Sequence, residues 1–188
     1  MGFKTILVPI EQHDLMNSTL ETALLLARKF NSYIEGFALR VAVPAVYAMA
    51  DGAVAIPQLE QDIAEHAKQT RTLFETFMQE HGVPRGSPTT APSRGWLEEA
   101  PEGDHFVGSH GRLFDVIVLG RPGRVGSRMT TLEAALFESG RPVLLAPPSP
   151  RLQMGTNVLI AWNCSTEQAR TTAFARPLLK RAIVASSY

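Results

Sequence analysis

A glycine-rich segment carries the clearest potential for chemistry in this sequence. Gly120, Gly123 and Gly126 are followed directly by Ser127, between an apolar run and a helical pattern. Glycines in such a connection allow backbone N–H groups to approach a phosphate, and the positive end of the following helix adds favourable charge. The segment also holds arginines that can pair with phosphate oxygens, namely Arg121, Arg124 and Arg128. The pattern therefore indicates a phosphate site, and the alternative is a plain turn with solvated arginines.

Other titratable and nucleophilic residues form no recognisable site in the sequence. One group of acidic residues and histidines, whose spacings match no standard zinc pattern, consists of Asp104, His105, His110 and Asp115. Cys164 is the only cysteine, which excludes an intrachain disulfide and a cysteine-based metal cage. No histidine is paired with an evident nucleophile, and Ser127 lacks the strained turn of a hydrolase. The sequence therefore predicts neither a metal site nor a catalytic group.

Apolar runs and helical patterns alternate along the first part of the chain and would position these residues. Residues 4–10 and 33–41 predict buried strands, and a helix between them begins at Ser18, three residues before Glu21 as in a capping box. This order is typical of a parallel βαβ unit. The later patterns predict helices at 58–82 and 132–139 and strands at 114–119 and 142–146. Weaker signals indicate an edge strand near Thr89, a short helix from Trp96 to about Gly103 and a turn at 108–111.

Parallel strands would bring several of these residues to one edge of a sheet. Ligands of open α/β sheets bind outside the carboxyl ends of the strands, where the strand order reverses. The candidate ligand-binding residues at those ends are Pro9, Ile10, Glu11, Val41, Gly120, Arg121, Gly123, Gly126 and Ser127. The neighbouring segment 41–57 is unusually apolar for a loop, and it either forms a partner surface or packs under the helix that follows.

A second stretch of the sequence repeats the beginning of the chain. Residues 157–162, NVLIAW, parallel residues 5–10, TILVPI, and Ser165 precedes Gln168 at the capping-box spacing. An internal repeat is the economical interpretation. The second copy holds one strand, one helix containing Pro177 and the beginning of another strand, which is too little to close a core by itself.

Composition restricts the classes of partner. The 188 residues carry 18 Lys and Arg against 18 Asp and Glu, so the net charge of zero provides no general basic surface for nucleic acid or anionic membrane. No stretch reaches the roughly 20 strongly apolar residues that a membrane helix needs, and the N-terminus lacks the pattern of a signal peptide. We therefore expect a cytoplasmic protein that binds neither nucleic acid nor membrane.

Four segments, taken in order along the chain, resemble a known family. They are KTILVPI at 4–10, FDVIVLGRPG at 114–123, ESGRPVLLAPP at 138–148 and NVLIAWNCSTEQARTTAFARPLLKRA at 157–182. Together they resemble the universal stress protein family, in its bacterial form with two domains in tandem. The resemblance implies a three-layer α/β sandwich, adenine nucleotide alpha hydrolase-like, with a five-stranded parallel sheet in the order 3-2-1-4-5. It also implies a complete universal-stress-type domain at 1–148, a linker at 149–156 and the truncated start of a second such domain at 157–188.

The resemblance further implies a nucleotide motif that this sequence keeps only in part. Nucleotide-binding members of the family carry Gly-x-x-Gly, nine further residues and then Gly-Ser or Gly-Thr. Gly120 and Gly123 match the first half, but Glu133 and Ala134 stand where the second half belongs. Glu11 stands where these members usually have Asp, and the carboxylate of Glu133 near a triphosphate would repel it.

Two functional hypotheses follow from the resemblance. The first is a stress-response protein that acts by binding and protein association, with a degenerate nucleotide site. In the family the last strand of the sheet pairs across an interface, which predicts a homodimer through Val143, Leu144 and Leu145. The alternative is a regulatory switch that binds an adenine nucleotide, ATP with Mg, and hydrolyses it slowly at most. A hydrolase or transferase is disfavoured because no pair of base and nucleophile can be named.

Overall fold

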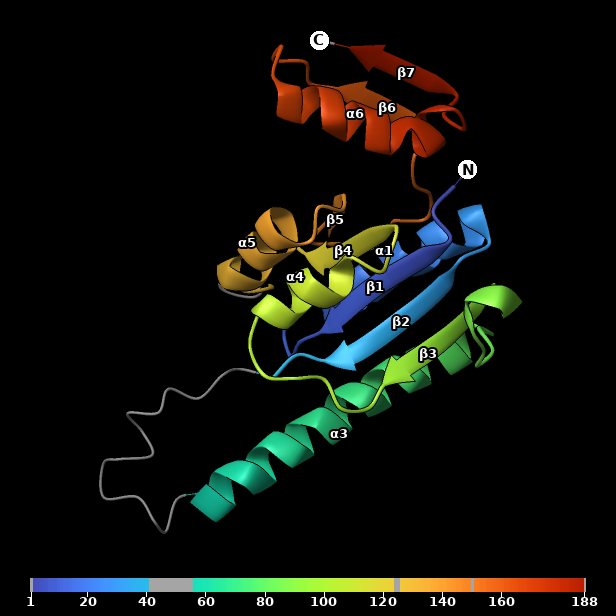
Figure 1. Cartoon of the computed structure of the whole chain (residues 1–188). Coiled ribbons are helices and arrows are strands. Elements are labelled where there is room, and N and C mark those ends of the chain that lie inside the picture. The colour runs from blue at the N-terminus through green and yellow to red at the C-terminus, as the bar shows by residue number, and fades with distance from the viewer. Residues whose placement is uncertain (1, 41–55, 124–125, 150, 188) are drawn as a thin grey trace.

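Figure 1 shows the computed structural model, which describes residues 2–40, 56–123, 126–149 and 151–187. The strands are β1 (Thr5–Ile10), β2 (Tyr33–Ala38), β3 (Ser93–Leu97), β4 (Val116–Gly120), β5 (Val143–Ala146), β6 (Asn157–Ile160) and β7 (Val184–Ser187). The helices are α1 (Met16–Phe30), α3 (Ile56–Glu80), α4 (His105–Gly111), α5 (Met129–Glu138) and α6 (Thr166–Leu179), with a 3-10 turn at Pro88–Thr90. Among the described residues, no helix is both long and apolar enough to cross a membrane.

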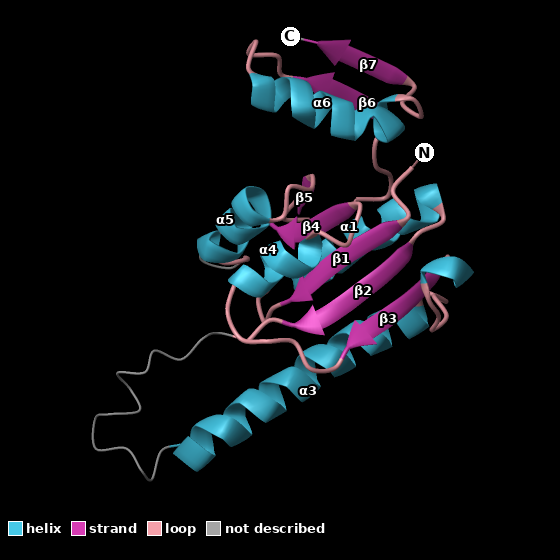
Figure 2. Cartoon of the chain, in the orientation of Figure 1, coloured by secondary structure: helices cyan, strands magenta, loops and turns pink. Residues whose placement is uncertain are grey.

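The first five strands form one parallel sheet in the order β3-β2-β1-β4-β5, and this confirms the predicted fold class (Figures 1 and 2). Ile6 of β1 lies opposite Ile34 of β2 and opposite Val116 of β4. β1 is therefore the central strand, and the chain adds strands first on one side of it and then on the other. The order reverses beside β1, which is where open α/β sheets bind ligands.

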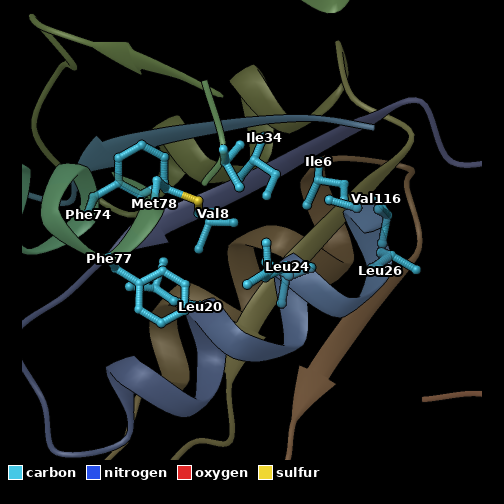
Figure 3. Close-up of a cluster of buried hydrophobic side chains, with 14 of the residues drawn as sticks. Ile6, Val8, Leu20, Leu24, Leu26, Ile34, Phe74, Phe77, Met78 and Val116 are labelled. Carbon is cyan, nitrogen blue, oxygen red and sulfur yellow. The ribbon is translucent and has the colours of Figure 1, made fainter. Parts of the chain in front are cut away.

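Helices cover both faces of this sheet, α1 and α3 on one face and α4 and α5 on the other (Figure 1). Ile6 and Val8 of β1 point toward α1 and α3, whereas Leu7 points toward α4 and α5, because successive strand residues face opposite ways. Figure 3 shows the first of these two cores, which includes Val8, Leu20, Leu24, Ile34, Phe74, Phe77 and Met78. Burial on both faces explains the continuous apolar run that predicted β1.

At the outer edge of the sheet one predicted element is wrong and another is displaced along the chain. The helix predicted from Trp96 to about Gly103 is in part the strand β3, and Thr89 lies in the 3-10 turn before it. β3 pairs with β2 so that Trp96 lies opposite Gly36, and the ring centroid of Trp96 is 5.5 Å from that of Phe74 in α3. Pairing with β2 and packing against α3 therefore outweigh the weak local pattern.

The turn predicted at 108–111 is also wrong, because these residues complete α4. Its glycines lie where the helix meets its neighbours. A Cβ atom on Gly108 would lie 2.8 Å from the carbonyl oxygen of Ala134 in α5, and one on Gly111 would lie 2.5 Å from Ile117 in β4. These glycines allow close packing of α4 against α5 and the sheet instead of forming a turn.

The start of α1 differs from the capping-box prediction as well. The helix begins at Met16, with Leu15 as its N-cap residue and no side-chain cap. Ser18 lies inside the helix, and its hydroxyl donates a hydrogen bond of 2.7 Å to the carbonyl oxygen of Pro147. The pairing with Glu21 as a capping box is therefore wrong, and Ser18 instead ties α1 to the segment that follows β5.

The remaining elements of the first unit match their predictions, with shifted ends. The strand predicted at 33–41 is β2 and ends at Ala38. The helix predicted at 58–82 is α3, which begins at Ile56 and ends at Glu80. Val41 and the rest of the segment 41–55 lie outside the described residues.

Residues 157–187 form a second strand, helix and parallel strand, in the order that the repeat predicted. Here the predicted cap is confirmed, because the Ser165 side chain accepts a hydrogen bond of 3.0 Å from the backbone N–H of Gln168. This second unit and the segment before it contact the end of α1. The Lys29 ammonium donates to the carbonyl oxygen of Met154 in the connecting segment at 3.0 Å, and the Arg181 guanidinium of the second unit lies 4.4 Å from the centre of the Phe30 ring.

Candidate functional site

The carboxyl ends of β1 and β4 bring several predicted site residues together. Glu11 follows β1, Gly120 ends β4, and Ser127 precedes α5 beside both of them. A Cβ atom on Gly120 would lie 3.0 Å from the hydroxyl oxygen of Ser127 and 3.0 Å from that of Thr19 in α1, so a larger residue would push these groups apart. Pro9 and Ile10 are buried, and they position Glu11 without presenting side chains to a ligand.

The described parts of the glycine loop between β4 and α5 bond to each other, while Arg124 lies outside the described residues. The N–H of Gly123 donates to the carbonyl oxygen of Ser127 and the N–H of Gly126 donates to that of Gly123, both at 3.4 Å. A Cβ atom on Gly126 would lie 2.0 Å from the carbonyl oxygen of Arg121, whereas one on Gly123 would meet nothing within 4 Å. Gly126 is therefore required by the loop itself, whereas the position of Gly123 has open space.

Arg128 fills the centre of the site with ionic contacts. Its guanidinium nitrogen Nη2 lies 2.6 Å from Oδ1 of Asp104, and its Nε lies 3.8 Å from Oε2 of Glu11. The hydroxyl of Thr131 donates to the same oxygen of Asp104 at 2.8 Å. Sequence reasoning placed Arg128 near a phosphate and found no role for Asp104, since only the packing of α4 beside α5 brings the two residues together.

Glu11 is a buried carboxylate with one unsatisfied oxygen. Only 9% of its side chain is exposed, its Oε2 accepts a hydrogen bond of 3.3 Å from the backbone N–H of Arg128, and its Oε1 has no partner among the described groups. Burial raises the pKa of Glu11, and the negative charge of Asp104 raises it further, against the lowering effect of Arg128 and Ser127. The site therefore holds its own anion in a poorly solvated place.

His13 and Ser127 form a contact that the sequence did not reveal, because 114 residues separate them. Nε2 of His13 lies 3.4 Å from the hydroxyl oxygen of Ser127, and Nδ1 of the same ring accepts the N–H of Leu15 at 3.1 Å. The proton of the neutral ring therefore sits on Nε2, so the ring cannot take the serine proton. Burial lowers the pKa of His13, which favours this neutral form. The pair stabilises the loop and does not form an activated nucleophile.

Little free space remains in this site. A cavity of about 150 Å³ is lined by Glu11, Gln12, His13, Leu39, His66, Gly126 and Arg128. Sites for drug-sized ligands usually measure about 300–1,000 Å³. A larger hollow of about 700 Å³ lies apart from it, between α1 and α3, and one of about 610 Å³ between α4 and α5 shares Asp104 and Arg128 with the site. The cavity beside Glu11 is therefore smaller than a usual site for a whole nucleotide.

The acidic residues and histidines that we considered for a metal site are distributed among separate partners. Asp104 pairs with Arg128, His105 lies 2.7 Å from a carboxylate oxygen of Glu138, and His110 lies 2.8 Å from one of Glu35. The carboxylate of Asp115 accepts the N–H groups of Lys4 and Thr5. Within the described ranges, no three His, Cys, Asp or Glu residues are grouped so that they could hold a metal ion.

The predicted interface residues lie on β5, at one edge of the sheet. β5 pairs only with β4 among the described strands. Val143 packs against the core under α4 and α5 and Leu144 against the opposite core, while Leu145 is 43% exposed. The helix that precedes β5, α5, also has exposed apolar side chains, which are Met129, Leu136 and Phe137. Leu145 is therefore the residue of this strand that presents an apolar side chain to solvent.

Comparisons with known proteins match this architecture at low sequence identity. No protein-family model and no curated protein sequence matches the chain. The solved structure of the universal stress protein UspA from Lactobacillus plantarum is 20% identical, with a TM-score of 0.55 over 78% of this chain and 99% of that one. A universal stress protein from Archaeoglobus fulgidus DSM 4304 is 15% identical, with a TM-score of 0.66 over 96% of this chain and 64% of that one.

A third solved structure is a universal stress protein in complex with cAMP. It is 13% identical and has a TM-score of 0.52 over 79% of this chain and 100% of that one. At such low sequence identity, the structural similarity establishes the fold alone, and the function has to be argued from the site. The chain has the universal stress protein fold.

Proposed function

We propose that this chain is a regulatory protein of the universal stress type, which acts in the cytoplasm in the stress response by associating with a second copy of itself. The observation that carries this proposal is the β5 edge, where Leu145 is exposed and no described strand covers it. An unpaired apolar edge strand is a ready template for pairing with another chain. Phe137 of α5 is 83% exposed and adds apolar surface on the helix that precedes β5.

Sedimentation velocity of the full chain tests this association. We expect a dimer for the wild type and a monomer for Leu145→Asp, because a carboxylate cannot be buried in an apolar contact without a partner. Leu152→Asp is a matched control, since Leu152 is 96% exposed in the segment between β5 and β6. A monomeric wild type, or equal loss of the dimer in both variants, would contradict the edge interface.

The same proposal includes a nucleotide site that is degenerate. It is supported by the contacts of Arg128 with Asp104 and Glu11, and by the small volume left beside them. We expect no heat of binding when Mg-ATP is titrated into the wild-type chain near neutral pH. In its domain organisation, the proposal assigns one universal-stress-type unit to 1–148, a linker to 149–156 and the start of a second unit to 157–188.

An adenine-nucleotide switch is the second candidate function. It is favoured by the structural neighbour that was solved in complex with cAMP. The phosphates would contact Gly120, Arg121, Gly123, Gly126 and Ser127, and Arg128 would have to leave Asp104. Gly123→Trp separates the two candidates, because a Cβ atom at Gly123 meets no described atom within 4 Å and the indole would stand where the phosphates must lie. Binding of Mg-ATP or cAMP to the wild type, lost in this variant, would establish the switch.

A further inference from the structure

The N-terminus of α5 has a physical preference for negative charge. Its first backbone N–H groups lack partners within the helix, and the helix dipole makes this end positive. Arg128 is the N-cap residue and provides no side-chain cap of its own. Its backbone N–H donates instead to Oε2 of Glu11, 117 residues away at the end of β1.

Glu11 is poorly suited to remain in that position as a charged group. Its side chain is more than nine-tenths buried, and its Oε1 has no hydrogen-bond partner in the part of the chain that the structure describes. The guanidinium of Arg128 is drawn toward Asp104, at 2.6 Å, and lies farther from Glu11, at 3.8 Å. A carboxylate offers this end of the helix two oxygens, and one of them stays unsatisfied. This position therefore attracts an anion, but the one that fills it is held there by its attachment to β1 and not by complete hydrogen bonding.

We propose that the carboxylate of Glu11 is a built-in occupant of an oxyanion site at the N-terminus of α5, and that neutralising or removing it opens this site to a phosphate-type oxyanion. This inference rests on the proposed function, since it explains why the nucleotide site is closed. The adjoining cavity of about 150 Å³ corresponds to about five water molecules at about 30 Å³ each. That volume accommodates one phosphate or sulfate group and not a whole nucleotide.

The charged and titratable groups around Glu11 set the direction of the pH dependence. Arg128 and Asp104 face it from the segments before α5 and α4, and His13 and His66 line the same cavity from the β1–α1 connection and from α3. Burial raises the pKa of Glu11, so its neutral fraction grows as the pH falls toward that raised value. Burial lowers the pKa of both histidines, so they gain charge only at still lower pH than usual. Anion binding by the wild type therefore increases as the pH falls.

Sulfate is a suitable probe, because it remains a dianion throughout the pH range in which Glu11 titrates. The experiment compares sulfate binding to the full-length wild type, Glu11→Gln and Glu11→Ala by calorimetry and by the NMR shift of the Arg128 amide. Glutamine removes the charge but keeps the shape, and alanine also empties the site. We expect affinity to rise in the order wild type, Gln, Ala, with a gain of at least about tenfold for Glu11→Gln at neutral pH. The gap between wild type and Glu11→Gln should narrow as the pH falls.

Glu133→Gln is the matched control, since Glu133 is an exposed carboxylate of the same helix, one turn further along. Equal gains from Glu133→Gln and Glu11→Gln would show only a long-range charge effect and overturn the proposal. So would sulfate affinity that is unchanged in both Glu11 variants. If either variant fails to fold, the pH series on the wild type decides, because pH-independent sulfate affinity also contradicts the proposal.

The outcome is separable from that of the proposed function. Mg-ATP binding by the wild type at neutral pH would overturn the degenerate nucleotide site, whatever sulfate does in the variants. Weak sulfate binding in every variant would overturn the role of Glu11 and leave the dimer and the absence of ATP binding untouched. Phosphate and AMP, titrated into Glu11→Ala, then distinguish a site for the free oxyanion from one for the phosphate of a larger molecule.

Discussion

The strand–helix–strand segment β1–α1–β2 and its repeat β6–α6–β7 share an order and a register but differ completely in burial. Thr5 pairs with Tyr33 at the start of the first, and Asn157 pairs with Val184 at the start of the second. In the first, Leu7 is fully buried. Its counterpart by sequence alignment, Leu159, is 65% exposed. None of the described residues from 151 to 186 is buried.

The neighbours of each segment explain the difference. β1 lies between β2 and β4, and helices cover both of its faces. β6 pairs with β7 alone in the described structure, and two strands with one helix leave a sheet face open. Isolated two-stranded sheets are marginally stable in water. The comparison teaches that local patterns are sufficient to specify a βαβ unit, whereas burial depends on the strands and helices added later in the chain.

A matched pair of leucine substitutions, one in the core of the first unit and one exposed in the second, should give the largest difference between the two units. Leu7→Ala should lower the free energy of unfolding by about 2–5 kcal/mol, because it leaves a cavity between the sheet and its helices. Leu159→Ala should change it by about 0.5 kcal/mol or less, as is usual for exposed positions. Urea unfolding followed by circular dichroism measures both values. A large loss from Leu159→Ala would mean that β6 is covered in solution.

Hydrogen exchange tests the same contrast without substitution. The amides of β6 and β7 should exchange at least about 100-fold faster than those of β1 and β2, which corresponds to about 2.7 kcal/mol in opening free energy. The expected reason is that few apolar contacts must break to open the second unit. Equal protection of the two units, at a concentration where the chain is monomeric, would remove the contrast.

The elements that the sequence predicted well are those whose own residues have the apolar pattern of a buried element. β1 and β4 are continuous apolar runs because both faces are covered, and Leu119 and Gly120 mark the end of β4 clearly. β3 was predicted only weakly, as an edge strand near Thr89 and so ahead of its true start at Ser93, because it contains Arg94 and Gly95, which carry no strand signal. Its conformation depends on pairing with β2, a contact that no local pattern contains.

The same distinction, between local pattern and tertiary packing, applies to the residues of the site. Glu11, Gly120 and Ser127 could be placed together, because the carboxyl ends of parallel strands meet at one edge of the sheet. The ion pair of Arg128 with Asp104 could not, since it depends on how α4 packs beside α5. The repulsion of a phosphate by Glu133 stays a prediction: Glu133 is exposed on α5, and the carboxylate that accepts a hydrogen bond at the helix N-terminus is that of Glu11.

Two serines sharpen the comparison further, because the same sequence signal has different roles in the two units. Ser165 caps α6, whereas Ser18 is buried inside α1 and bonds to Pro147. Alanine at either position should destabilise its unit by about 1 kcal/mol, through a lost cap or a lost buried hydrogen bond. Aspartate separates them in thermal melts: Ser165→Asp should be neutral, since Asp caps helices well, and Ser18→Asp should lower the melting temperature because it buries a charge. Equal melting temperatures for the two aspartate variants would contradict the assigned roles.

The contact between the two units provides the smallest expected effect. The guanidinium of Arg181 lies over the Phe30 ring and donates to the carbonyl oxygen of Lys29, so it joins β6–α6–β7 to the end of α1. Because an exposed cation–π contact contributes about 0.5–1 kcal/mol, Arg181→Ala should leave the unfolding of the first unit unchanged. It should raise the rate of proteolysis between β5 and β6, by up to about fivefold. Arg170→Ala, which removes an exposed arginine of α6 in the same unit, is the control, and equal cleavage rates in the two variants would show that Arg181 does not hold the units together.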